Sequence, residues 1–195
     1  MSLERSLSPQ DLSHVLSWQT SYDLPIGPNR FVNLNPWGNR ILGGWTVNTI
    51  VFLSSGTPIA SPNGTGDPYF NQRPDMTCDP GKGAPHTAAQ WLNYTCFSEP
   101  ASQFVPGTAP AFLAHARTDG GHNLDASIFK NIPVAEHANL QLVFAAYNVT
   151  NSVQYGYPNV FWNPNPTPAN MAGFGQVTNS ANTPRQLQFA VRFTF

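Results

Sequence analysis

Charged residues are scarce in this chain. Only 10% of its 195 residues are Asp, Glu, Lys or Arg, against about 25% in ordinary soluble domains. So low a fraction is difficult to reconcile with a surface that meets water on every side. The formal net charge of −1 also provides no basic stripe that could neutralise a phosphate backbone, so nucleic acid is not expected as a partner.

Long apolar runs are missing as well. The sequence contains no stretch of 18 or more consecutive apolar residues, which excludes a transmembrane helix. A chain without such a helix can span a membrane only as part of a closed β-barrel. The segment Met1 to Arg5 lacks the basic, apolar and small-residue regions of a secretory signal, so for an outer-membrane protein we expect the targeting segment upstream.

Cysteine is limited to Cys78 and Cys96, which lie in the same irregular stretch. A disulfide between them would suit an oxidising exterior. Two free thiols are the open alternative, because the sequence does not show whether the two Cα atoms approach each other. A zinc site is not expected, since two scattered cysteines without adjoining histidines do not form a tetrahedral ligand set.

Signatures of catalysis are absent too. The sequence has no Gly-x-Ser-x-Gly elbow, His-Glu-x-x-His motif, phosphate loop or dinucleotide fingerprint, so we expect no enzyme and no cofactor. His115, Asp119 and His122 form the tightest group of metal-ligating residue types, but without a helix their spacing defines no common face. Three further acidic residues lack the ligand spacing of a calcium loop and are expected in solvated turns: Asp67, Asp75 and Asp79.

What the sequence does contain is alternation, most clearly over residues 185–195. Because successive side chains of a strand point to opposite faces, one face would be apolar and the other more polar. The apolar face would consist of Leu187, Phe189, Val191, Phe193 and Phe195. A strand of about 9–11 residues crosses a bilayer at the tilt of a barrel, with lipid outside and a polar lumen inside. The last strand of a soluble β-sandwich would show the same alternation.

The same period of two predicts four earlier strands, near 12–24, 45–55, 123–132 and 139–148, with Pro133 ending the third. Two long irregular segments, 59–122 and 149–183, separate them and are expected to carry specificity. The predicted connections are moderate, long, short and long in turn, and such an asymmetry is typical of outer-membrane barrels. The predicted fold is therefore all-β, an antiparallel up-and-down transmembrane β-barrel. Because membrane barrels have at least about eight strands, five strands indicate a C-terminal fragment of a larger barrel.

Several motifs carry a resemblance to a known family. They include Asp11-Leu12-Ser13-His14, Tyr22-Asp23-Leu24-Pro25, Leu42-Gly43-Gly44-Trp45, Ser54-Ser55-Gly56-Thr57-Pro58, Asn123 to Asn131 and Pro184 to Phe189. In this order they resemble the last part of TonB-dependent outer-membrane receptors, most closely the group with an N-terminal carboxypeptidase-regulatory-like domain. The similarity extends over most of the 195 residues.

The resemblance implies a 22-stranded barrel with an N-terminal plug, which imports a scarce ligand with energy from the TonB system. The plug and the segment that contacts TonB would lie upstream of this chain. Phe189, Val191, Phe193 and the terminal Phe195 are similar to the signal that the barrel-assembly machinery reads, and such an apolar edge strand can pair with a strand of that machinery. The expected partners are thus outer-membrane lipid, the assembly machinery, the TonB system and an unidentified ligand.

Aromatic residues in the long segments suit stacking on a sugar or an aromatic ligand: Tyr69, Phe70, Trp91, Tyr94, Tyr155, Tyr157, Phe161 and Trp162. Packing of these rings within the loops is the favoured alternative. Trp18, Tyr22 and Trp45 lie near strand ends and could belong to an interfacial aromatic girdle. Two other functions remain open: a secreted β-sandwich that binds carbohydrate, and a surface barrel or adhesin without transport.

Overall fold

The chain folds into two compact units in the computed structural model, which describes residues 5–64, 73–102, 105–135, 137–163 and 173–195. The sheet unit comprises Val15–Leu53, His122–Ser152 and Thr183–Phe195. The loop unit comprises Met1–His14, Ser54–Gly121 and Val153–Asn182. In the described part of the chain, no helix has the length and apolar character needed to cross a bilayer.

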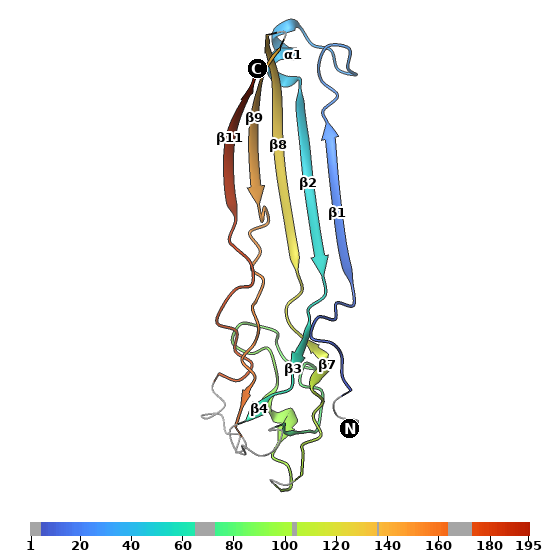
Figure 1. Cartoon of the computed structure of the whole chain (residues 1–195), viewed down its shortest axis with the longest axis vertical. Helices are drawn as coiled ribbons and strands as arrows, with labels where there is room; N and C mark the ends of the chain where they lie inside the picture. Colours follow the sequence, from blue (N-terminus) through green and yellow to red (C-terminus); the bar gives the residue numbers. More distant parts are fainter. Residues whose placement is uncertain (1–4, 65–72, 103–104, 136, 164–172) are drawn as a thin grey trace. The chain divides into compact units, whose positions relative to one another are not determined.

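The sheet unit is built on one five-stranded sheet, and the order of its strands in space is their order in the sequence (Figure 1). Its strands, in spatial order, are β1 (Val15–Asp23), β2 (Trp45–Ser54), β8 (His122–Ala135), β9 (Ala138–Tyr147) and β11 (Gln186–Thr194). The pairs β2 with β8, β8 with β9 and β9 with β11 are antiparallel. The alternation in the sequence therefore located all five strands, within a few residues at each end.

The expectation that Pro133 ends its strand is wrong, because β8 continues to Ala135 with an irregularity between Pro133 and Ala135. The pairing of β8 with β2 ends where Lys130 lies opposite Trp45. Asn131 still donates its N–H to Gly44 on that side, and the nitrogen of Pro133, two residues later, points the same way. No strand of the described residues pairs with β8 there, so the missing N–H of proline removes no ladder hydrogen bond.

A short helix, α1 (Pro36–Leu42), lies in the connection between β1 and β2, whose asparagine and glycine content predicts a turn and not a helix. Asn35 caps its N-terminus by accepting a hydrogen bond from the N–H of Gly38 at 2.6 Å, and Pro36 occupies the first turn, where no N–H is needed. The N–H of Gly43 donates to the carbonyl of Asn39 at the other end. The helix lies at the end of the sheet that also carries the C-terminus (Figure 1).

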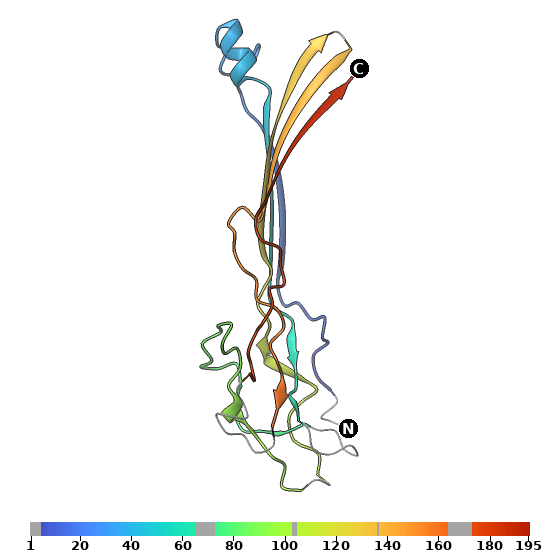
Figure 2. The same cartoon turned by 90° about the vertical axis from the view of Figure 1, so that its left-hand side faces the viewer.

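The sheet is open, since β1 and β11 each have a neighbour on one side only among the described strands. Figure 2 shows β8, β9 and β11 bending together to one side as they approach the end with the C-terminus, while α1 lies toward the other side. An open sheet in hydrocarbon would leave main-chain N–H and C=O groups without partners. The five strands therefore need further strands to close a barrel.

The two long segments of the loop unit are predicted to be irregular, but the structure forms short strands within them. Its described residues contain three pairs of short strands: β3 (Pro58–Ala60) with β7 (Phe112–Arg117), β4 (Asn63–Gly64) with β10 (Phe161–Trp162), and β5 (Asp75–Met76) with β6 (Phe97–Ser98). A single turn of 3-10 helix, η2 (Tyr94–Cys96), precedes β6. Each pair joins segments that are distant in the sequence.

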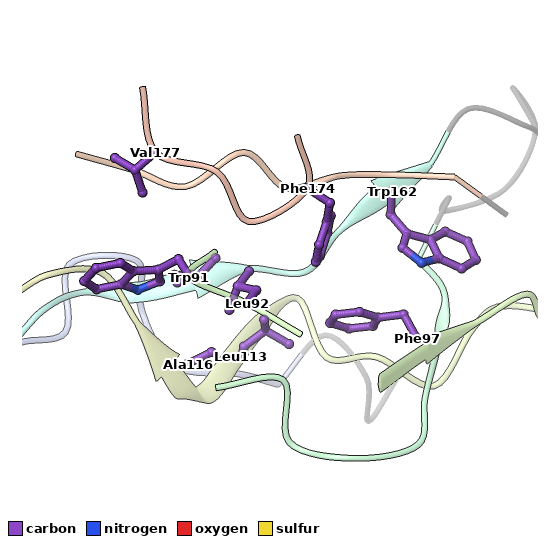
Figure 3. Packing of buried hydrophobic residues seen from close by; sticks show 9 residues of the cluster. Trp91, Leu92, Phe97, Leu113, Ala116, Trp162, Phe174 and Val177 are labelled. Atoms are coloured by element: carbon purple, nitrogen blue, oxygen red, sulfur yellow. The ribbon is translucent and has the colours of Figure 1, made fainter. Parts of the chain in front are cut away.

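A hydrophobic core lies within the loop unit (Figure 3). Its buried members are Ile59, Trp91, Leu92, Phe97, Leu113, Ala116, Trp162, Phe174 and Val177. The rings of Phe97 and Phe174 meet edge to face, with centroids 5.9 Å apart. Both long segments contribute to this cluster, so the two connections fold as one body and not as separate loops.

Candidate functional site

The apolar face of the sheet is the first candidate functional surface. Residues directly opposite each other in paired strands point to the same face. One row across the sheet consists of Val47, Ile128, Phe144 and Phe189, and the next toward the C-terminal end consists of Trp45, Lys130, Leu142 and Val191. The alternating apolar residues of the separate strands thus merge into one continuous surface.

Nothing in the described chain covers the part of this surface that belongs to β11. Leu187, Phe189 and Val191 are 78%, 59% and 54% exposed. A β-sandwich would bury these residues beneath a second sheet, so the soluble sandwich considered from the sequence is not the fold. The rings of Phe144 and Phe189 lie 4.9 Å apart, as expected for a directly opposed pair.

The opposite face of the sheet is more polar. Gln141 donates from its amide to the side-chain oxygen of Asn131 at 2.9 Å, and the hydroxyl of Tyr147 donates to Gln188 at 3.3 Å. Asp23 accepts a hydrogen bond from Thr46 at 2.7 Å and pairs with Arg30. This face also carries a few apolar side chains, such as Phe52, but it holds most of the hydrogen-bonding side chains of the strands.

The four residues that resemble an assembly signal form the end of the apolar face. Phe189, Val191 and Phe193 lie on β11 at alternate positions, and Phe195 follows that strand. All four are exposed, and the rings of Phe193 and Phe195 lie 5.8 Å apart. The free edge of β11 could therefore present a row of apolar side chains together with unpaired main-chain groups.

Of the aromatic residues expected near strand ends, Tyr22 and Trp45 lie at neighbouring ends of β1 and β2, whereas Trp18 lies within β1. Trp18 and Tyr22 on β1 are exposed. Trp45, which begins β2, instead donates its indole N–H to the carbonyl of Ile41 at 3.0 Å. Trp45 is therefore attached to α1, which a sequence period alone could not show.

The loop aromatics fall into three groups. Tyr69 and Phe70 lie outside the described residues. Trp91 and Trp162 are buried, and Tyr94 and Tyr155 pack against the same core. Trp91 donates its indole N–H to Arg117 at 2.8 Å and meets the ring of Tyr155 edge to face at 5.6 Å. Buried rings cannot stack on an incoming ligand, so Trp91 and Trp162 are core residues and not ligand contacts.

Tyr157 and Phe161 are the exposed aromatic residues among the described part of the loop unit. The hydroxyl oxygen of Tyr157 accepts a hydrogen bond from the N–H of Ala60 at 2.6 Å. Partial burial raises the pKa of this hydroxyl, against the lowering effect of the Ala60 N–H. Tyr157 thus stays neutral at physiological pH, and its ring is oriented by the contact with β3.

The structure joins Cys78 and Cys96 in a disulfide, with Cα atoms 4.8 Å apart. Thr77 donates its N–H to the carbonyl of Cys96 at 2.9 Å, and Asn93 donates to Pro80 at 2.9 Å. The covalent bond therefore closes a segment that main-chain hydrogen bonds also hold.

Three of the candidate metal-binding carboxylates accept main-chain hydrogen bonds instead. Asp119 accepts the N–H of Tyr155 at 2.8 Å, Asp75 that of Thr108 at 2.9 Å and Asp79 that of Gly81 at 3.0 Å. Asp67 lies outside the described residues. Within the ranges that the structure describes, no three His, Cys, Asp or Glu side chains form a group able to hold a metal ion.

An antiparallel sheet with one exposed apolar face and one more polar face is typical of β-barrel proteins of the outer membrane. A comparison with protein families supports this class. The chain belongs to the outer membrane beta barrel domain family, whose model matches residues 1–188. The protein is therefore assigned to the bacterial outer membrane. Searches of curated proteins and of solved structures found no match.

Proposed function

We propose that this chain forms the C-terminal part of the barrel of a TonB-dependent outer-membrane receptor, which takes up a scarce ligand actively and catalyses no reaction. The open sheet carries the proposal. An outer-membrane barrel must pair every strand edge, and β1 and β11 both have free edges in the described structure. Strands from a preceding part of the polypeptide would close the barrel between them.

The loop unit supports a receptor function. Segments 59–122 and 149–183 both leave the sheet at the strand ends opposite Phe195. Short connections are typical of the periplasmic side and long ones of the cell exterior, so the loop unit would face the medium. A packed core and a disulfide make it a stable body on which Tyr157 and Phe161 present aromatic rings to a ligand.

An outer-membrane adhesin without transport is the competing function, because it would use the same sheet and loops. The two functions differ in the plug and in the segment that contacts TonB. We expect the protein purified from outer membranes to have a mass far above the 21.3 kDa of this chain. Peptide mass spectrometry should identify a plug domain N-terminal to the barrel.

Transport itself is tested in cells. Deletion of the gene should abolish uptake of one compound from a panel of radiolabelled ferric chelates, corrinoids and oligosaccharides, and loss of TonB should abolish uptake of the same compound. The double variant Tyr157→Ala and Phe161→Ala should lower uptake while surface abundance stays unchanged. A mature protein without a plug, or uptake that does not depend on TonB, would overturn the proposal in favour of the adhesin.

A further inference from the structure

Lys130 stands out on the apolar face of the sheet. It lies opposite Trp45 on one side and Leu142 on the other. The row beyond it toward the C-terminal end is apolar as well, with Ile132 opposite Leu140 and Leu140 opposite Phe193. A lysine exposed to lipid destabilises an outer-membrane barrel, by about 2–4 kcal/mol at the bilayer midplane and by less toward the interface. This position therefore needs a structure that removes the charge from lipid.

The connection that contains α1 supplies this structure. The ammonium group of Lys130 donates to the carbonyls of Ile41 at 2.6 Å and Gly43 at 3.0 Å, and it lies 5.0 Å from the centre of the Trp45 ring. Carbonyls at the C-terminal end of a helix attract a cation. Lys130 is only 6% exposed as a result.

These contacts also place α1. Lys130 and Trp45 both belong to the apolar face, and both side chains donate to the carbonyl of Ile41. The C-terminal end of α1 is therefore fixed to the same face that meets lipid. The attachment uses main-chain carbonyls and leaves the apolar side chains of the helix free to face outward.

The outward side of α1 is apolar. Trp37, Ile41 and Leu42 are 76%, 63% and 50% exposed. Trp37 and Ile41 are four residues apart and share one face of the helix. Asn39 lies on another side, where it accepts the N–H of Leu34 and donates to Asn33 and Leu34. The helix thus directs polar groups toward its own connection and a large apolar group away from it.

We propose that α1 is an interfacial helix that inserts Trp37, Ile41 and Leu42 into the phospholipid leaflet at the C-terminal end of the barrel, with Lys130 as its tether. Lipid is the occupant because Trp45 on β2 and Lys130 on β8 fix the C-terminal end of α1 to the apolar face that would meet lipid. A tryptophan beside apolar residues is typical of helices that lie in a membrane interface. Arg40, an exposed residue in the last turn of the helix, would meet anionic headgroups. This inference depends on the barrel and not on transport.

Spin labels test the proposal in the complete protein, reconstituted in vesicles of phosphatidylethanolamine and phosphatidylglycerol. Cys78 and Cys96 form a disulfide, so neither of them has a free thiol that would react with the label. A single cysteine introduced into this chain can therefore be labelled selectively. We expect the ratio of collisions with oxygen, which concentrates in lipid, to collisions with a water-soluble nickel chelate to be severalfold higher for Trp37→Cys than for Arg40→Cys. The Arg40 position serves as the matched control because it lies on the same helix.

Two outcomes would overturn the lipid contact: equal accessibility of both positions to the nickel chelate, or exclusion of both reagents from position 37, which would indicate a protein cover. The tether is tested by Lys130→Gln in the protein labelled at position 37. We expect greater mobility of the label and a lower collision ratio, and unchanged spectra would reject Lys130 as the tether. Heat-modifiable migration on gels confirms that each variant has a folded barrel.

Discussion

Arg117 binds Asp11 through two kinds of hydrogen bond: its guanidinium donates to the Asp11 carboxylate and also to the main-chain carbonyl of Asp11 at 3.0 Å. The same guanidinium donates to the carbonyl of Gly56 at 2.9 Å. The carbonyl of Arg117 accepts the indole N–H of Trp91. Arg117 thus connects the segment that precedes β1, the start of β3 and the core of the loop unit.

Replacement of Asp11 by asparagine should loosen this connection. A charge-assisted hydrogen bond is replaced by a neutral one, and because both groups are partly exposed we expect a loss of about 1 kcal/mol. Hydrogen exchange of peptides covering residues 5–14 should then accelerate about fivefold. Asp79→Asn is the control, since Asp79 bonds within its own turn. Equal exchange in the Asp11 variant and the native protein would contradict this role.

The disulfide should stabilise the segment that it closes. Cys78 and Cys96 are 18 residues apart, and a closed loop of this length contributes about 3 kcal/mol through the entropy of the unfolded chain. Lys82 lies inside the loop and offers a site for trypsin. The double variant Cys78→Ala and Cys96→Ala should be cleaved there about a hundredfold faster, if cleavage follows local opening.

Reduction provides the matched control for that experiment. Dithiothreitol should accelerate cleavage after Lys82 in the native protein and leave the double variant unaffected. A native protein whose cleavage rate does not respond to the reductant would argue against a stabilising disulfide.

Asn148 should be essential for the connection that follows β9. Its φ is 50°, and its buried amide donates to the carbonyls of Ser152 and Thr183, both at 3.0 Å, while its oxygen accepts the N–H of Ser152. Asn148→Gly retains the backbone conformation but loses these bonds, with an expected loss of about 2 kcal/mol. The temperature at which heat-modifiable migration is lost should fall.

Asn148→Ala should be less stable than Asn148→Gly, because alanine also strains the positive φ. Asn29→Gly is the control, since exposed Asn29 has a φ of 62° and its replacement should leave the midpoint nearly unchanged. A midpoint for Asn148→Gly equal to that of the native protein would show that the side-chain bonds do not matter.

The strands of the sheet could be predicted because each repeats one signal over nine or more residues. The loop unit gives no such signal, since its strands of two to six residues are too short to show a clear period and their partners lie far away in the sequence. Its core pairs Phe97 with Phe174, a contact that only the folded chain creates. The sequence alone therefore predicts Trp91 and Trp162 as candidate ligand contacts, although both are buried in the structure.

Helix α1 is a different case, because its signals were present in the sequence. Asn35 followed by Pro36 is typical of a helix start, and Gly43 of a helix end. Seven residues between these signals are too few to show a helical period, so the asparagine and glycine content indicated a turn. Lys130 falls in the apolar register of its strand, and its tolerance there depends on a contact with α1 that spacing cannot reveal.

Deletion of Phe195 should reduce assembly of the complete protein into the outer membrane. The residue is almost fully exposed at the end of β11 and extends the apolar row of Phe189, Val191 and Phe193. Loss of this aromatic side chain would weaken recognition of the edge strand by the assembly machinery. Surface labelling and heat-modifiable migration measure the assembled fraction. Thr194→Ala, on the opposite face, should assemble normally, and unchanged surface abundance after the deletion would refute the signal.

The assignment of the two faces is tested by moving one charge by one residue along β9. Phe144 lies between Ile128 and Phe189 on the apolar face, whereas Ala145 lies between Ser127 and Gln188 on the polar face. Phe144→Arg would place a charge in lipid, at a cost of about 2–4 kcal/mol near the bilayer midplane, and Ala145→Arg would place it toward the aqueous lumen.

We expect the unfolding midpoint of the reconstituted barrel to fall markedly for Phe144→Arg and only slightly for Ala145→Arg. Phe144→Leu controls for loss of the ring. A larger loss for Ala145→Arg than for Phe144→Arg would reverse the faces and remove the basis for both the barrel orientation and the lipid contact of α1.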